Sequence, residues 1–219
     1  MSRERFEQEL GHLQEQVLAL GSMAERAVRE AVTALARQDL AAARRIIDSD
    51  HVINERRFEL ESEILTIIAT QQPMAGDLRK LASSLELAGE LERIADYAKG
   101  IANVALMIGT EPLVKPLVDI PRMADLACGM LNRALEAFSR WDVDLARAVP
   151  KEDAEVDTLY ERIYRHLAEI IQKDPRTLDQ AIRLSWVAHN LERVADRVSN
   201  LCERVVFSVL GRMEELAAP

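Results

Sequence analysis

The sequence predicts an all-α fold of two tandem three-helix bundles, with six long helices related by a pseudo-twofold internal repeat. Three observations predict it. Apolar residues recur every three or four positions along almost the whole chain. The 219 residues include only 8 Gly and 7 Pro, and aromatic residues make up 4%, whereas turn-rich all-β folds need more of each. Finally, the two halves of the chain align on each other.

Residues typical of helix ends divide the periodic pattern into six segments. Asp39 is a candidate N-cap and Pro73 follows a helix end, and Asp142 and Pro175 repeat these two breaks in the second half. Pro150 falls inside the fifth segment, where a proline removes a backbone donor and predicts a kink. The expected helices span residues 3–37, 39–71, 74–108, 120–140, 142–173 and 176–213.

The chain is expected to contain two domains joined by a proline-containing linker. The first bundle is assigned to residues 1–110, the linker to 111–121 and the second bundle to 122–219, each bundle with its own core. An offset of 103 residues aligns Asp50 with Asp153, and an offset of 100 later aligns LERIAD at 91–96 with LERVAD at 191–196. Helices joined by breaks this short are expected to be antiparallel neighbours.

The charge balance excludes several classes of function. The net charge is −9 and the pI about 5.1, so nucleic acid and anionic membrane are poor direct ligands. The charged N-terminal residues lack a secretion signal, and no apolar run approaches the roughly 20 residues that span a bilayer. We therefore expect a cytoplasmic protein that meets a membrane only through partners.

Cys128 and Cys202 form no CxxC pair and are expected in the core.

Acidic and amide side chains occupy positions where an apolar helix face is expected. Because an α-helix turns about 100° per residue, Glu92 and Glu192 share the direction of their helices' apolar stripes. In a low-dielectric core, such carboxylates must pair, protonate or bind a cation. Oxygen ligands from neighbouring helices suit Mg²⁺, Ca²⁺, Mn²⁺ or iron. The candidate i, i+4 pairs are Asp50 and Asn54, Glu92 and Asp96, Asp153 and Asp157, and Glu192 and Asp196.

An internal network of ion pairs is the alternative to a bound metal. Arg93 can meet Asp96, and Arg193 can meet Asp196, in both cases at the i, i+3 spacing. His51 and His189 lie beside the acids in sequence, either as groups that support metal ligands or as helix-surface residues. The residues alone leave both hypotheses open.

The repeated Leu-Glu-Arg-[Ile/Val]-Ala-Asp motif, together with QPMAGDLR at 72–79 and Met23-Ala24, resembles the PhoU family of phosphate-uptake regulators. The resemblance extends from about residue 6 to residue 209. It implies a non-enzymatic cytoplasmic regulator that couples a phosphate ABC transporter to a sensor histidine kinase and represses signalling when phosphate is plentiful. The implied partners are the transporter's ATPase subunit and the kinase. Long bundles leave apolar grooves, so we also expect a homodimer.

The resemblance also implies metal-site residues, since some members of the family hold multinuclear iron or other metal clusters (Mn, Zn, Ni or Mg) at ExxxD and DxxxD positions. Gly100 and Asn54 remove ligand capacity from the first half, so that if only one cluster forms, it is expected in the second half. The positions carried over are Asp50, Asn54, Glu92 and Asp96, then Asp153, Asp157, Glu192 and Asp196, with Asn200 one turn further on.

The sequence gives less support to other classes of function. A ferritin-like di-iron enzyme needs two Glu-x-x-His motifs, and Glu9 with His12 forms the single match. The sequence has no GxSxG elbow and no phosphate-cradling glycine loop. An accessory protein of another phosphate or metal transporter is the remaining alternative. Trp141 and Trp186 are candidate interface anchors, although local packing is expected for Trp141 because it ends a helix.

Overall fold

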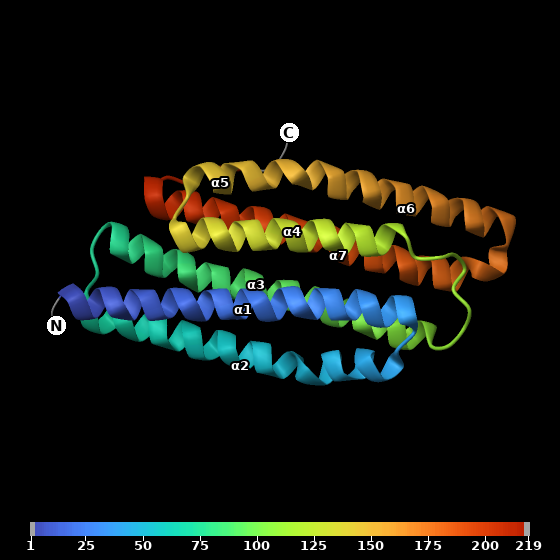
Figure 1. The fold of residues 1–219 in the computed structure, drawn as a ribbon, viewed down its shortest axis with the longest axis horizontal. Coiled ribbons are helices and arrows are strands. Elements are labelled where there is room, and N and C mark those ends of the chain that lie inside the picture. The colour runs from blue at the N-terminus through green and yellow to red at the C-terminus, as the bar shows by residue number, and fades with distance from the viewer. Residues whose placement is uncertain (1–2, 217–219) are drawn as a thin grey trace.

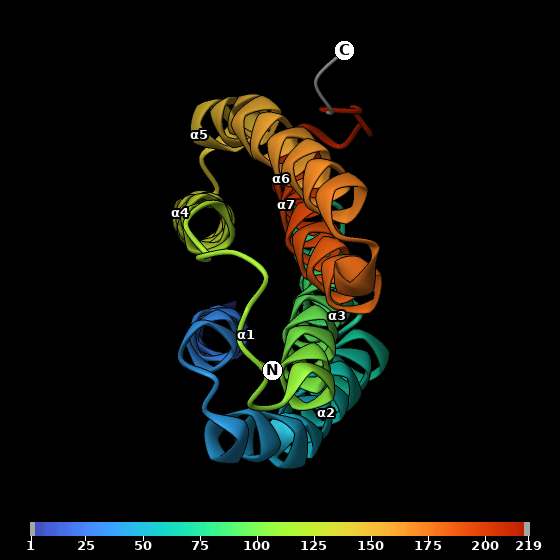
Figure 2. The ribbon, with the colours of Figure 1, turned by 90° about the vertical axis from the view of Figure 1, so that its right-hand side faces the viewer.

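The computed structural model describes residues 3–216 and is all-helical over that range, as expected. Seen from the end, α1, α3, α4 and α7 occupy the middle of the molecule, α2 covers one side, and α5 with α6 covers the opposite side (Figure 2). The long helices run nearly along one axis (Figure 1). Their bounds are α1 Arg3–Arg37, α2 Leu40–Gln71, α3 Gly76–Ile108, α4 Asp119–Arg140, α5 Val143–Ala148, α6 Asp153–Lys173 and α7 Leu178–Leu210.

The helix boundaries confirm most of the expected breaks. The Asp39 side chain accepts a hydrogen bond from the Ala42 N–H at 2.9 Å, and Asp142 does the same for Leu145 at 2.9 Å. The expected fifth helix differs, because Pro150 interrupts it rather than only bending it. A 3₁₀ turn, Val149–Glu152, separates α5 from α6. No helix within residues 3–216 is long and apolar enough to cross a membrane.

The two halves share one continuous hydrophobic core, so the expectation of two separate cores was wrong. Antiparallel packing of α3 on α7 and contact between α1 and α4 join the halves. Helices α1 and α4 approach each other closely because Gly21 lacks a side chain. A Cβ atom at that position would lie 2.5 Å from Leu135 Cδ1. Cys128 and Cys202 are free thiols buried in this core, as expected, and burial raises the pKa of each to about 12.

The connection between α3 and α4 is fastened to both halves. Gln180 is 9% exposed, and its Oε1 accepts the Val114 N–H at 2.6 Å while its Nε2 donates to the Pro112 carbonyl at 3.1 Å. Gln38 Nε2 donates to the carbonyls of Gly109 and Glu111. The linker is therefore part of the packed structure. The outermost residues of the two expected domains, 1–2 and 217–219, lie outside the described range.

The bonds of Gln180 predict a large stability effect for one side chain. Gln180→Leu leaves the Val114 N–H and the Pro112 carbonyl without partners. The free energy of unfolding is expected to fall by about 2–3 kcal/mol, which is the cost of unsatisfied buried polar groups. Urea unfolding followed by circular dichroism measures it. Gln172→Leu, on the exposed surface of α6, is the control and is expected to change stability by less than about 0.5 kcal/mol. Equal stability of the two variants would contradict the role of Gln180.

Candidate functional site

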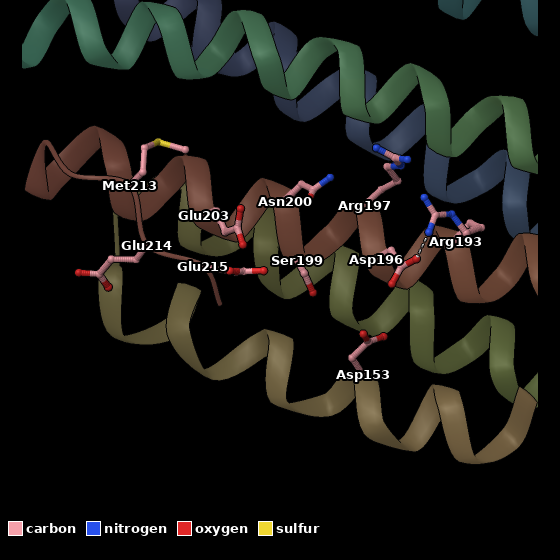
Figure 3. Close-up of a pocket in the computed structure, with 10 residues that line it drawn as sticks. All are labelled: Asp153, Arg193, Asp196, Arg197, Ser199, Asn200, Glu203, Met213, Glu214 and Glu215. Carbon is pink, nitrogen blue, oxygen red and sulfur yellow. Dashed lines mark hydrogen bonds and ion pairs between the residues drawn. The ribbon is translucent and has the colours of Figure 1, made fainter. Parts of the chain in front are cut away.

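The predicted acids lie on two pairs of packed helices, α2 with α3 and α6 with α7. Of these acids, Asp153 and Asp196 line an open pocket beside α6 and α7 (Figure 3). Asp50 is buried, whereas Asp96 and Asp157 are exposed and the others are partly exposed. The expectation of a low-dielectric core around all of them was therefore wrong. The second acid of each pair lies about 40° further round its helix, and that rotation turns Asp96 and Asp157 towards solvent.

In the first half, lysine and arginine side chains neutralise the acids. Lys99 Nζ lies 2.7 Å from Asp50 Oδ2, and Asn54 Nδ2 donates to the same oxygen at 3.2 Å. Arg57 Nη1 lies 3.5 Å from Glu92 Oε1. The hydrogen bond to Asp50 raises the pKa of Lys99, which keeps the ammonium charged. In the first half, the geometry therefore matches a network of ion pairs within the chain, the alternative to a bound metal.

In the second half, Asp153 has no cationic partner among the described residues. Its Oδ1 atom is buried without a hydrogen bond. Burial first, and then the charges of Asp157, Asp196 and Glu192, together raise the pKa of Asp153 to about 6. The pKa of Asp157 is also raised, first by burial and then by Glu192 and Asp196. A carboxylate surrounded in this way binds either a proton or a cation.

The partners of the other two acids in this groove come from α7 itself. Arg193 Nη1 lies 2.6 Å from Asp196 Oδ2, as the i, i+3 spacing predicted, and His189 Nδ1 lies 2.9 Å from Glu192 Oε2. In the first half, Arg93 instead lies 3.8 Å from Glu90. No cation on α6 meets these acids among residues 3–216, so the groove between α6 and α7 keeps an excess of negative charge.

Residue differences at two matched positions explain why the first half has cations beside its acids and α6 has none. The offset of 100 places Ser199 where the first half has Lys99, and the offset of 103 places Tyr160 where it has Arg57. Ser199 is 7% exposed and its Oγ has no hydrogen-bond partner. The sequence reasoning missed Lys99, Ser199 and Tyr160, although the same two offsets identify all the replacements. The second half therefore has room and negative charge where the first half has its own cations.

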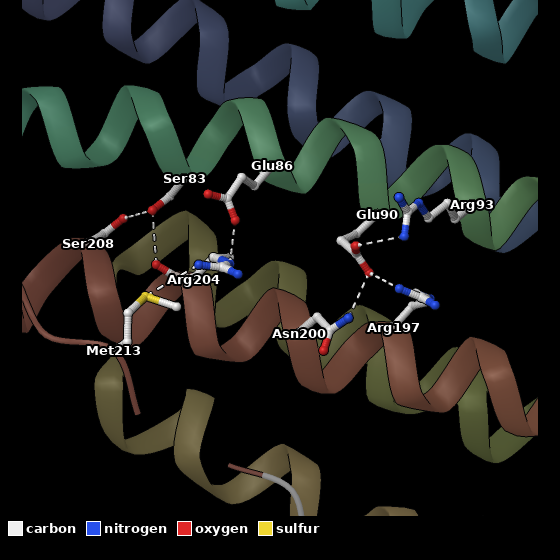
Figure 4. Close-up of polar contacts among 9 residues, drawn as sticks. All are labelled: Ser83, Glu86, Glu90, Arg93, Arg197, Asn200, Arg204, Ser208 and Met213. Carbon is white, nitrogen blue, oxygen red and sulfur yellow. Dashed lines mark hydrogen bonds and ion pairs between the residues drawn. The ribbon is translucent and has the colours of Figure 1, made fainter. Parts of the chain in front are cut away.

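Asn200 lines the pocket that Asp153 and Asp196 also line, and its side chain bonds across the junction of the two halves. Its Nδ2 donates to Glu90 Oε2 at 3.0 Å, across the contact between α3 and α7 (Figure 4). Arg197 Nη1 lies 3.4 Å from the same oxygen. The amide nitrogen of Asn200 is therefore held at the junction of the halves.

The carboxylate and hydroxyl oxygens of these residues are of the kind that hard cations prefer. The side chains that carry them do not converge on one point. Within residues 3–216, no group of three or more His, Cys, Asp or Glu side chains is close enough to hold a metal ion. Oxygen donors, an orphaned Asp153 Oδ1 and an orphaned Ser199 Oγ occur together in the second half. The oxygen donors of the second half therefore suit a hard cation in their chemistry, whereas Lys99 and Arg57 make the first half a poor match for one.

Comparisons with known proteins match nearly the whole chain. A family model described as the PhoU domain matches it twice, at residues 17–105 and 120–205. The phosphate-specific transport system accessory protein PhoU homolog of Clostridium acetobutylicum is 33% identical over 99% of both chains. The phosphate-specific transport system accessory protein PhoU of Escherichia coli K12 is 34% identical over 95% of this chain and 86% of its own length.

Solved structures agree with the fold. The crystal structure of PhoU from Pseudomonas aeruginosa superimposes with a TM-score of 0.89 and 32% identity, covering 94% of this chain and 100% of the other. The crystal structure of the phosphate transport system regulatory protein PhoU from Streptococcus pneumoniae superimposes with a TM-score of 0.89 and 28% identity, covering 95% of this chain and 99% of the other.

The charge difference between the halves predicts opposite effects for one substitution at matched positions. Asp50→Asn removes the partner of Lys99 and is expected to lower the free energy of unfolding by about 1 kcal/mol. Asp153→Asn removes an uncompensated charge. It is expected to raise that free energy by about 1 kcal/mol at pH 8, a value discounted from the full pKa shift because the groove is partly open to solvent.

The pH dependence follows from the sign of the Asp153 shift. Its folded-state pKa, about 6, exceeds the usual value of 3.8, so the folded state holds the proton more tightly. Ionising Asp153 therefore costs stability as the pH rises through 6, and costs nothing below about 3.8. Urea unfolding in chelator at pH 4 and pH 8 measures the effect. A loss of stability in Asp153→Asn at pH 8 would contradict it.

Proposed function

The chain belongs to the PhoU family, and we propose that it is an accessory protein of a phosphate transport system. The family consists of non-enzymatic accessory and regulatory proteins. The relatives that match over 95% or more of this chain carry names of phosphate-specific transport accessory proteins. The observation that carries the proposal is the double match of the family model to both halves, in the order and at the spacing of the structural repeat.

In finer terms, the protein is a cytoplasmic adaptor between the transporter's ATPase subunit and the sensor histidine kinase, and it represses signalling when phosphate is plentiful. The resemblance implies this role. The absence of a phosphate-cradling glycine loop in the sequence supports it indirectly. The transporter would detect phosphate, and this chain would pass the result on by changing which partner it contacts.

Exposed apolar side chains supply contact surfaces for such partners. On α7, Leu178, Ile182 and Trp186 recur at the i, i+4, i+8 spacing, and Trp186 is 61% exposed. At the other end of α7, Leu210 is exposed, as is Leu78 at the start of α3. Exposed aromatic and aliphatic groups of this kind anchor protein interfaces. A second copy of the chain, forming the expected homodimer, could use the same surfaces.

The other tryptophan, Trp141, makes contacts within the chain instead. Trp141 ends α4, packs edge-on against Phe138 with ring centroids 4.9 Å apart, and lies under Lys80 Nζ at 5.4 Å. Trp186 is therefore the better of the two candidate anchors.

A complementation experiment tests the adaptor role. A strain that lacks the gene, and has no paralogue, is expected to express its phosphate-starvation genes in phosphate-rich medium. The wild-type chain is expected to restore repression. Trp186→Ala is expected to weaken binding to a partner about 30-fold or more, since truncating an interface anchor costs about 2 kcal/mol or more, and to restore repression poorly. A reporter gene measures repression.

Phe58→Ala is the matched control, because Phe58 is 58% exposed but lies on α2. It is expected to restore repression fully at equal protein abundance. Normal repression in the deletion strain would contradict the regulatory proposal, while equal complementation by both variants would contradict the α7 surface.

We further propose that the second half binds metal through Asp153, Asp157, Glu192 and Asp196, with iron, Mn, Zn, Ni and Mg as the candidates. The orphaned Asp153 Oδ1 atom and the absence of a cation on α6 support this. When bound, a metal would hold α6 and α7 at a fixed spacing. The Arg193 and His189 side chains are placed to orient Asp196 and Glu192. Lys99 and Arg57 oppose a metal in the first half.

Metal content tests the asymmetry between the halves. Protein purified without a tag or chelator is expected to contain one or more metal equivalents by elemental analysis. Glu192→Ala/Asp196→Ala is expected to lose them, since a site that loses two ligands binds far more weakly. Glu92→Ala/Asp96→Ala, the matched change in the first half, is expected to retain them. Loss of metal in the first-half variant alone would contradict the assignment.

A further inference from the structure

Helices α1 and α2 line a pocket of about 490 Å³ close to the turn that joins them (Figure 1). Each helix contributes an arginine to it, Arg37 from the last turn of α1 and Arg45 from the second turn of α2. None of the acids predicted as metal ligands lines this pocket. Its volume is within the range of about 300–1,000 Å³ that small-molecule sites usually have. The pocket is therefore a separate candidate site for a small ligand.

The two arginines of the pocket carry positive charge that the chain does not neutralise. Among residues 3–216, no acid lies within ion-pair distance of Arg37 or Arg45. The third arginine of the pocket differs, because Arg29 lies 2.6 Å from Glu25 and 2.7 Å from Asp125. A guanidinium group presents paired N–H donors that match the oxygens of a phosphate or a carboxylate. Two unpaired guanidinium groups from two helices can therefore bind one anion.

The hydrogen-bond acceptors of the pocket lie further from the turn than the two arginines. Glu30 is two turns before Arg37 on α1, and Ser49 is one turn after Arg45 on α2. Ser49 Oγ donates to the Ile46 carbonyl at 3.2 Å, so its oxygen remains able to accept a hydrogen bond. This part of the pocket therefore suits the hydroxyl or amine groups of a ligand rather than its negative charge.

A second hollow, of about 210 Å³, continues the pocket along the same two helices. Three residues, Glu30, Ile46 and Ser49, line both spaces, so the two are continuous. Apolar side chains dominate the rest of the second hollow, together with Arg26: Met23, Ala27, Val52 and Ile53. A methionine thioether packs favourably against an aromatic ring. We call the two spaces together the α1–α2 groove.

The α1–α2 groove thus offers cations, hydrogen-bond acceptors and an apolar surface in that order. We propose that it binds a phosphate ester of the nucleotide class. The phosphate would lie between Arg37 and Arg45, the sugar hydroxyls would donate to Glu30 and Ser49, and the base would lie in the apolar hollow. Inorganic phosphate would fill only the arginine end. The site goes beyond the proposed transport role and does not depend on it.

The second half of the chain does not repeat this site. The offset of 103 residues places Arg140 where the first half has Arg37. The same offset places Ala148 where the first half has Arg45, so one of the two arginines is missing. One nucleotide per chain is therefore expected.

Isothermal titration calorimetry of the full-length chain with ADP, adenosine and inorganic phosphate tests the proposal. ADP is expected to bind at one site per chain. Adenosine and inorganic phosphate are each expected to bind at least about tenfold more weakly, because each makes only part of the contacts. The titrations contain a chelator, so that the proposed metal site takes no part.

Variants at the two ends of the groove test the placement of the ligand. Arg37→Ala/Arg45→Ala is expected to weaken ADP binding at least about tenfold, since it removes charge-assisted hydrogen bonds to the phosphate. Both arginines are exposed and unpaired, so the fold is expected to remain, as circular dichroism checks. Val52→Asp, in the apolar hollow, is expected to weaken ADP binding and to leave binding of inorganic phosphate unchanged. Arg140→Ala/Arg165→Ala removes two exposed arginines from the second half and is the matched control.

The control is expected to bind ADP as the wild type does. The absence of ADP binding at concentrations up to about 1 mM would overturn the proposal, as would adenosine or inorganic phosphate binding as tightly as ADP. Unchanged ADP affinity in Arg37→Ala/Arg45→Ala or in Val52→Asp, or an equal loss in the control, would also overturn it.

Discussion

The antiparallel packing of α3 on α7 is the contact on which the rest of the molecule depends. Polar groups mark it along its length. Ser208 Oγ donates to Ser83 Oγ at 2.7 Å near one end, and Glu90 meets Arg197 and Asn200 near the middle (Figure 4). Arg183 donates to the Met107 carbonyl near the other end. These bonds fix the register of the two helices. That register merges the two halves into one core, and α2 and α6 then pack on opposite sides, which creates the two acidic grooves.

The two halves of the repeat differ in how the charge of the acids between their helices is compensated. A carboxylate between packed helices needs a positive partner. The first half supplies Lys99 and Arg57 within the chain, whereas the second half has Ser199 and Tyr160 at the matched positions. The first groove is complete without a ligand. The second groove keeps uncompensated charge and unsatisfied oxygens, which lower stability and which the proposed cation would compensate.

The helices, their breaks and the repeat could be predicted from the sequence because periodicity, caps and prolines are local signals. The shared core could not, since contact between α3 and α7 and the close approach at Gly21 depend on how helices distant in the chain meet. The acid positions were predictable, but no local signal in the sequence pairs Asp50 with Lys99, because the two residues lie on different helices. Helix geometry also placed Asp96 and Asp157 too deep, because a 40° rotation decides between core and solvent.

A crystal of this protein soaked in Mn²⁺ and measured at the manganese absorption edge tests the central claim most directly. Anomalous peaks are expected in the groove between α6 and α7, within about 2.5 Å of carboxylate oxygens, and none between α2 and α3. Peaks of equal height in both grooves, or a peak beside Asp50 alone, would show that Lys99 and Arg57 do not decide where a cation binds.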